Sequence, residues 1–215
     1  MKTSNTERRK ALKKIKHILI TLATAILLIA DIAPPIVYAN ETNKIVNEQQ
    51  EIQKAVDEID EKLSQPINIS EAELNARISE AKERYPDLTE ERMKELAYQT
   101  LTPYSYRASV WDGKGVTLSE FAWVVENLIA SAISGGVAGI GNLVKKRGLA
   151  AARATLSRVA KNAAIRLGIY SNWLGVILDR AFDYINIFYN VGYGLAKYVD
   201  SIDFHKNNGR INAWP

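Results

Sequence analysis

The side chains that could carry chemistry are few, and their spacing does not assemble a reactive site. The chain has no cysteine and two histidines, and His205 has no partner at metal-site spacing. Four carboxylates near the end of the chain could act in pairs as acid and base: Asp179, Asp183, Asp200 and Asp203. Because they are spread along one aromatic-rich segment, ion pairs with Arg180 and Lys197, or a polar edge, are the favoured interpretation.

The run from Asp203 to Ile211 has some features of a calcium-binding loop. If Gly209 is taken as the invariant glycine of such a loop, Phe204 and Lys206 occupy the first and third ligand positions. Neither side chain binds calcium, so we expect a helix end followed by a turn. The sequence also lacks the strand-turn-helix serine motif and the H-E-x-x-H zinc motif. It therefore predicts no metal, no cofactor and no enzymatic activity.

A glycine-rich run stands directly against three cations in SAISGGVAGIGNLVKKRG, residues 131–148. A phosphate-binding loop needs a lysine after its last glycine, whereas Asn142 follows Gly141 here. Small residues recur four positions apart in this run, and its key glycines are Gly135, Gly136 and Gly139. Such spacing lets two helices approach closely in a bilayer. It equally permits a bend or a tight crossing in a water-soluble bundle, and both interpretations stay open.

The segment after the glycines is cationic. No acidic residue lies between Glu126 and Asp179, but seven cations do: Lys145, Lys146, Arg147, Arg153, Arg158, Lys161 and Arg166. Over residues 149–167 one helix face is apolar: Leu149, Ala152, Leu156, Val159, Ala163 and Leu167. Basic amphipathic helices bind anionic lipid surfaces, and tryptophan favours the same interface. We therefore expect the three glycines, the seven cations and Trp173 to form a membrane-binding or helix-contact site.

The N-terminus has the order of a secretory signal peptide. Seven Lys and Arg between Lys2 and Lys16 precede the apolar run ILITLATAILLIA, residues 18–30, and the small residues Val37 and Ala39 follow. We expect cleavage between Ala39 and Asn40, and a secreted protein. Residues 1–39 hold seven cations and two anions, which leaves 21 cations and 22 anions in the rest. The basic isoelectric point therefore gives no support for a nucleic-acid partner.

Helical periodicity covers the chain after this leader. Residues 40–101 predict an acidic, coiled-coil-like segment of three charged helices with a thin core. Residues 40–100 have a net charge of −7, from 8 cations and 15 anions, whereas residues 101–215 have a net charge of +6, from 13 and 7. The asymmetry suggests two regions with different roles that attract one another. A linker at 102–116, with a turn at Asp112–Gly113, separates them.

The second region, residues 117–215, is predicted to be an apolar and cationic helical domain. A capping box at Thr117 and Glu120 opens an apolar helix that Gly135 and Gly136 break or kink. A short run closed by Gly148, an amphipathic helix at 149–167 and a long aromatic segment at 171–203 follow. The predicted fold is all-α: an exported protein with an acidic N-terminal helical segment and a C-terminal apolar and cationic bundle or hairpin.

Two stretches carry a resemblance to a known group: FAWVVENLIASAISGGVAGIGNLVKKRG and YGLAKYVDSIDFHKNNGRINAW. With the long basic leader and the acidic helical front, they resemble the secreted, non-lytic larger bacteriocins of Gram-positive bacteria, of the dysgalacticin, streptococcin and helical enterocin type. The resemblance implies antibacterial action at the cytoplasmic membrane of target cells, or on a sugar-transport receptor in it, with an immunity protein as a further partner. The alternative is an exported, non-enzymatic protein-interaction module whose apolar helices are its core.

Overall fold

The computed structural model describes residues 44–101 and 115–213, and these residues are mostly helical. The predicted helical class is thereby confirmed. The chain divides into two units, residues 1–49 and residues 50–215. In the first unit the described residues 44–49 are helical. The predicted signal peptide, its cleavage at Ala39 and Asn40, and most of the predicted linker lie outside the described residues.

The acidic segment supplies three helices, as its periodicity predicts. Residues 44–64 are helical, and α2 (Glu71–Arg84) and α3 (Glu90–Leu101) follow. The hydroxyl of Ser70 accepts a hydrogen bond from the backbone N–H of Glu73 and so caps α2. These helices bury apolar side chains such as Leu63, Leu74 and Met93 in the same core cluster as the C-terminal helices. The change in charge along the chain therefore does not coincide with a boundary in packing.

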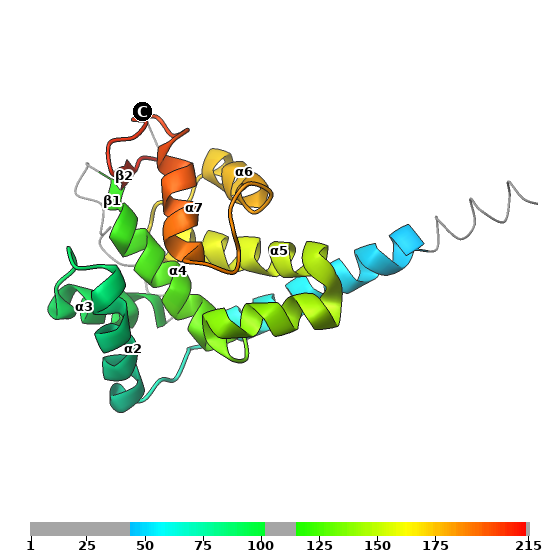
Figure 1. Ribbon diagram of the computed structural model, residues 1–215, viewed down its shortest axis with the longest axis horizontal. Coiled ribbons are helices and arrows are strands. Elements are labelled where there is room, and N and C mark those ends of the chain that lie inside the picture. The colour runs from blue at the N-terminus through cyan, green and yellow to red at the C-terminus, as the bar shows by residue number, and fades with distance from the viewer. Residues whose placement is uncertain (1–43, 102–114, 214–215) are drawn as a thin grey trace, which may run out of the picture. The chain divides into compact units, whose positions relative to one another are not determined.

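The centre of the second unit is the helix α4 (Leu118–Ala132). It begins with the predicted capping box, in which Thr117 and Glu120 each bond the other's backbone N–H. In Figure 1, α4 runs between α2 and α3 on one side and the later helices on the other. Every side chain from residue 121 to residue 129 is buried, and Trp123 Nε1 donates to the carbonyl oxygen of Met93 at 3.0 Å. Within the described residues, this apolar helix is thus covered by protein along its length from residue 121 to residue 129.

The glycines end this helix and shape the next one. A 3₁₀ turn, η1 (Gly136–Gly139), leads into α5 (Ile140–Arg166). Gly148 interrupts α5 with a φ of 84° and a ψ of 164°. Only glycine adopts such a conformation without strain. The short run and the amphipathic helix predicted on either side of Gly148 are both present.

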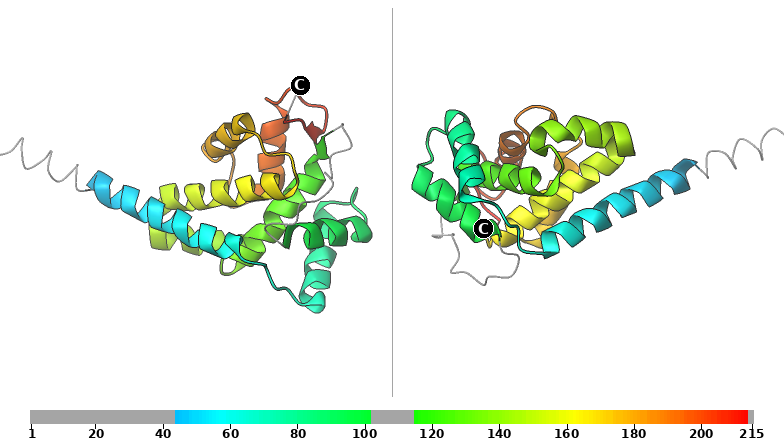
Figure 2. Two further views of the ribbon diagram at one scale, coloured as in Figure 1. Left: turned by 180° about the vertical axis from the view of Figure 1, so that it is seen from behind. Right: turned by 90° about the horizontal axis from the view of Figure 1, so that it is seen from below.

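The aromatic-rich segment, predicted as one long stretch, forms two helices. They are α6 (Asn172–Ala181) and α7 (Val191–Asp200), and residues 182–190 connect them without helical structure. Ser171 caps α6 through the N–H of Leu174, at 3.1 Å. Asn190 precedes α7 with a φ of 45°, a left-handed conformation that asparagine tolerates better than most residues. Figure 2 shows this connection as an open loop between the two helices.

Two short strands join the ends of the C-terminal region. The strand β1 (Val116–Thr117) pairs antiparallel with β2 (Arg210–Ile211), with Val116 opposite Ile211. Gly115 permits the approach, because a Cβ at that position would lie 2.5 Å from the carbonyl oxygen of Ile211. This pair is a small departure from the predicted absence of strands, since its two-residue length leaves no periodicity in the sequence.

Candidate functional site

The glycine run forms a tight bend between α4 and α5. Gly135 and Gly136 have φ values of 82° and 58°, which disfavour any other residue. Gly139 has an ordinary φ of −73°, but a Cβ there would lie 2.0 Å from the carbonyl oxygen of Ser134. The backbone hydrogen bond from Gly139 to Gly135, at 2.9 Å, closes the turn. Of the two interpretations, the structure has the bend: the chain folds closely upon itself at the three glycines.

Three of the seven cations bind the acidic front segment. Arg147 Nη2 lies 2.6 Å from Glu58 Oε2, and Arg158 forms an ion pair with Asp60. Arg166 donates to two backbone carbonyl oxygens of that segment. The attraction suggested by the charge asymmetry is present as these specific contacts.

Two further cations pair with carboxylates that stood out in the sequence. Arg153 Nη1 lies 2.8 Å from Asp183 Oδ1, and Lys161 Nζ lies 2.7 Å from Asp179 Oδ2. The Ser157 hydroxyl also donates to Asp179. These acids do pair with cations, but their partners lie on α5, not at Arg180 or Lys197 as predicted.

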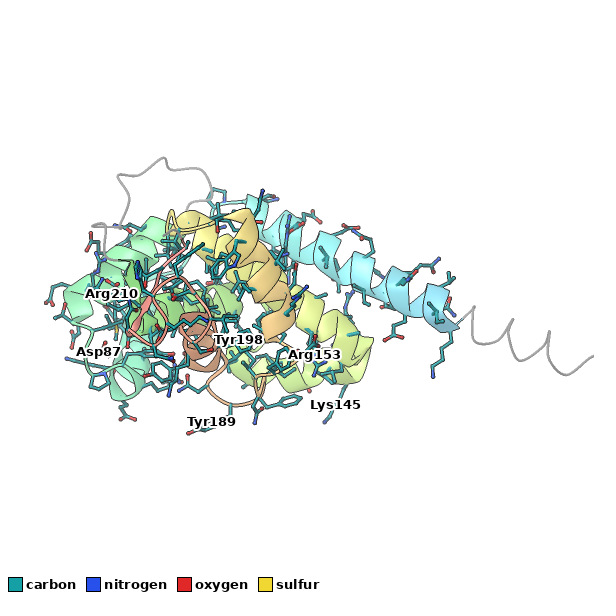
Figure 3. All side chains as sticks on the ribbon, turned by 90° about the horizontal axis from the view of Figure 1, so that it is seen from above. Asp87, Lys145, Arg153, Tyr189, Tyr198 and Arg210 are labelled. Atoms are coloured by element: carbon teal, nitrogen blue, oxygen red, sulfur yellow. The ribbon has the colours of Figure 1, made fainter. Side chains whose placement is uncertain are left out.

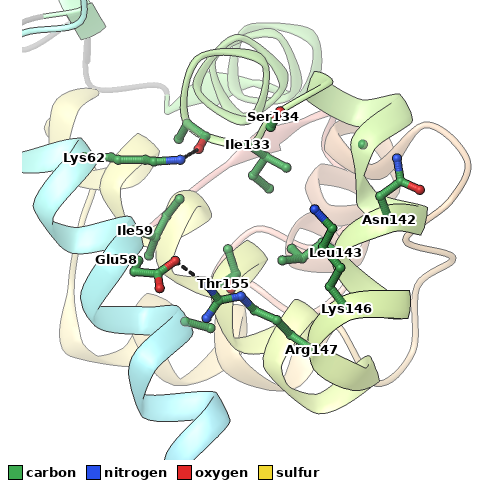
Figure 4. Close-up of a pocket in the computed structure, with 13 residues that line it drawn as sticks. Glu58, Ile59, Lys62, Ile133, Ser134, Asn142, Leu143, Lys146, Arg147 and Thr155 are labelled. Atoms are coloured by element: carbon green, nitrogen blue, oxygen red, sulfur yellow. Dashed lines mark hydrogen bonds and ion pairs between the residues drawn. The ribbon is translucent and has the colours of Figure 1, made fainter.

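Lys145 and Lys146 differ from the other five. Both are exposed, and neither has an ion pair among the described residues. Lys145 points away from the unit into solvent (Figure 3). Lys146 instead lines a cavity of about 250 Å³ beside the bend, together with Glu58, Lys62 and Arg147 (Figure 4).

The apolar face of residues 149–167, predicted to meet a membrane or another helix, is mostly turned inward. Of its members, Ala152, Leu156, Val159, Ala163 and Leu167 are buried, and Leu149 alone is exposed. No single helix among the described residues is long and apolar enough to cross a bilayer. The pair formed by α4 and residues 136–166 meets that test jointly, but it bends by 63° at the glycines. In the folded state these apolar surfaces form the core.

Trp173, the last member of the predicted site, is partly buried at the start of α6. Its ring centroid lies 5.0 Å from that of Phe204, which is itself 46% exposed. Trp173 therefore packs against Phe204 at the surface and is only partly exposed to solvent.

Sequence reasoning missed a group of aromatic residues on the α6–α7 connection. Tyr184, Phe188 and Tyr189 are 73%, 59% and 78% exposed. The Tyr184 ring stacks on Tyr198 at 5.5 Å, and Tyr189 points outward in Figure 3. We call Tyr184, Phe188 and Tyr189 the aromatic loop. The asparagines Asn186 and Asn190, which favour turns, are the sequence signal that could have located it.

A single acidic residue, Glu126, lies within the buried part of α4. Its carboxylate is 3.1 Å from Arg84 Nη2, so it joins α4 to the end of α2. Burial raises the pKa of Glu126, and the nearby Arg84 opposes that rise. Glu126 also lines a pocket with Arg84 and Trp123, and its ion pair with Arg84 links α4 to α2 at that pocket.

The remaining carboxylates hold the backbone of the C-terminal turn. Asp200 accepts from the N–H groups of Asn208 and Gly209, and Asp203 accepts from those of His205 and Asn212. Burial raises the pKa of Asp203. Among the described residues no group of three or more His, Cys, Asp or Glu side chains could hold a metal ion. These acids thus organise a helix end and a turn, which agrees with the interpretation placed on Asp203–Ile211.

No model of a known protein family, no characterised protein and no solved structure matches the chain. Function must therefore be inferred from the surface that the fold presents.

Proposed function

We propose that the chain is an exported antibacterial protein of bacteriocin type that acts at the cytoplasmic membrane of target cells through its C-terminal helical region. The observation that carries this proposal is the aromatic loop, whose three large rings are mostly in contact with solvent. Tyrosine and other aromatic side chains favour the membrane interface, and clustered exposed apolar groups mark binding surfaces. The leader-like N-terminus and the resemblance of the glycine-rich and C-terminal stretches add support.

The proposed mode of action is surface binding by the folded protein. The aromatic loop inserts its rings at the headgroup boundary, and the unpaired Lys145 and Lys146 add attraction to anionic lipid. The partner is the lipid itself or a receptor embedded in it, and an immunity protein would bind the same surface in the producing cell. Insertion of α4 is not needed, which is consistent with the burial of every side chain from residue 121 to residue 129.

A second candidate is an exported, non-enzymatic interaction module. The burial of every side chain from residue 121 to residue 129 favours it, because a helix that only builds a core needs such surroundings. In this case the aromatic loop would bind another protein, since exposed aromatic residues are also enriched at protein interfaces.

Purified residues 40–215, applied to lawns of several Gram-positive bacteria, test the proposal. We expect inhibition of at least one strain with intact cell walls, and binding to phosphatidylglycerol vesicles above that to phosphatidylcholine vesicles. Growth inhibition without release of dye from dye-loaded vesicles would indicate that the protein acts on a receptor in the membrane. A well-folded protein that neither inhibits growth nor binds vesicles would rule out the antibacterial role and leave the interaction module.

A further inference from the structure

The cavity beside the glycine bend has the composition of a small binding site. Its floor is apolar, formed by Ala55, Ile59, Ala132, Ile133 and Leu143. Polar and charged groups surround this floor, as Figure 4 shows for Lys62, Lys146, Arg147 and Ser134. The volume of about 250 Å³ is below the roughly 300–1,000 Å³ of pockets for drug-sized molecules, so a small group fits best.

The charge around the cavity is positive. Lys62, Lys146 and Arg147 line it, and Glu58 is the one acidic side chain among the lining residues. Glu58 is already neutralised by Arg147 Nη2, at 2.6 Å. Lys62 Nζ donates to the carbonyl oxygen of Ala132 at 2.9 Å, and an ammonium group has two further N–H donors. The cavity therefore has an excess of cations and of hydrogen-bond donors.

One of these donors is buried without an acceptor. Arg147 Nη1 has no hydrogen-bond partner among the described residues, although the other terminal nitrogen is bound to Glu58. A buried donor without an acceptor is costly. Because Nη1 is closed off from solvent, the guanidinium of Arg147 must turn slightly toward the cavity before an oxygen atom there can accept from it. Lys146 has no ion pair within residues 44–101 and 115–213, and it also lines the cavity in Figure 4. Arginine and lysine together are the usual donors to phosphate oxygens.

We infer that this cavity binds the phosphate group of an anionic molecule, with Arg147 and Lys146 donating to its oxygens and Lys62 adding positive charge. The glycines are needed for it, because Gly139 lines the cavity and the bend brings α5 opposite the first helix. The phosphate can belong to a phospholipid headgroup or to a soluble molecule. The lipid source rests on the proposed function, whereas phosphate binding itself does not.

Two neighbouring lysines provide a matched test. Lys145→Gln and Lys146→Gln remove the same charge from adjacent exposed positions, but Lys146 alone of the two lines the cavity. The first measurement is a titration of residues 40–215 with inorganic phosphate, followed by amide NMR. We expect saturable shifts at Ser134 and Asn142 in the wild type and in Lys145→Gln, and about fivefold weaker binding in Lys146→Gln. Absence of saturable shifts, or equal weakening by both variants, would overturn the inference.

Vesicle binding then identifies the source of the phosphate. If Lys146→Gln binds phosphatidylglycerol vesicles several-fold more weakly than Lys145→Gln does, the ligand is a lipid headgroup. If the two variants bind vesicles equally while their affinities for phosphate differ, the ligand is a soluble phosphate. Equal melting temperatures confirm that both variants are folded. A wild type that inhibits no strain and binds no vesicle contradicts the proposed function, but leaves the phosphate titration to decide on the cavity.

Discussion

Arg166 Nη2 lies 2.6 Å from the carbonyl oxygen of Leu63, and Arg166 Nη1 also donates to the carbonyl oxygen of Thr100. Leu63 and Thr100 are close to the ends of two different helices of the acidic front, where backbone carbonyls lack partners within the helix. One side chain at the end of α5 therefore satisfies carbonyls of both helices. This is a structural role for a residue that the sequence assigned to a membrane-binding or helix-contact site.

Replacing Arg166 by methionine should destabilise the fold by about 1.5–3 kcal/mol, since charge-assisted hydrogen bonds to partly buried carbonyls are lost. Arg158→Met is the control, because Arg158 also binds the front segment but does so through an exposed ion pair with Asp60. That pair is worth at most about 1 kcal/mol. Urea unfolding of both variants checks the order; equal losses would contradict the role given to Arg166.

A methyl group should be tolerated at Gly141, in the first turn of α5, but not at Gly139 in the glycine bend. In Gly139→Ala the new Cβ would lie 2.0 Å from the carbonyl oxygen of Ser134, so the bend must shift at a cost of about 1–3 kcal/mol. In Gly141→Ala nothing lies within 4 Å of the new Cβ, and alanine should stabilise α5 by about 0.5–1 kcal/mol. Thermal melts of the two variants should move in opposite directions, and a fall in both would count against the sterics.

Glu126 should make stability depend on pH in a defined direction. Its pKa is raised in the folded state above the ordinary value of 4.5, mainly by burial. The stability linked to the protonated carboxyl is therefore fully present below that ordinary value and is lost as pH rises through the raised pKa. Glu126→Gln does not titrate, so the variant should gain stability relative to the wild type as pH rises above the ordinary value of 4.5. Denaturant unfolding at several pH values measures this, and a constant difference would show that the pKa is not raised.

Binding to target membranes should depend on Tyr189, which is 78% exposed in the aromatic loop. Because the ring is mostly in solvent, Tyr189→Ser should change the free energy of unfolding by less than about 0.5 kcal/mol. We expect the same change to weaken both vesicle binding and growth inhibition. Tyr98→Ser on α3, at a position 52% exposed, is the comparison and should leave binding intact. If the two variants bind alike, the aromatic loop is not the contact surface.

Local signals in the sequence were sufficient to predict the helices and their ends. The capping residues Ser70 and Thr117 begin helices as expected, and Gly135 and Gly148 interrupt the chain where their backbone freedom is needed. Such signals act over a few residues, so a short segment of the chain contains the information that sets each helix end.

The partners of the cations could not be predicted in the same way. Arg147 and Glu58 are 89 residues apart, and no periodicity relates them. The sequence indicated only that a negative and a positive region would attract one another. It also could not show whether an apolar face meets lipid or another helix, because both surroundings select the same residues at the same spacing.

The position of α4 has a consequence for the order in which the protein is made. Its largest contact is with α7, which comes about sixty residues later in the chain. While the chain is still being synthesised, α4 is complete but its main cover does not yet exist. An apolar helix in that state is a binding site for chaperones and for other nascent chains. Packing of α7 onto α4 is therefore the step after which this apolar surface is no longer available for aggregation.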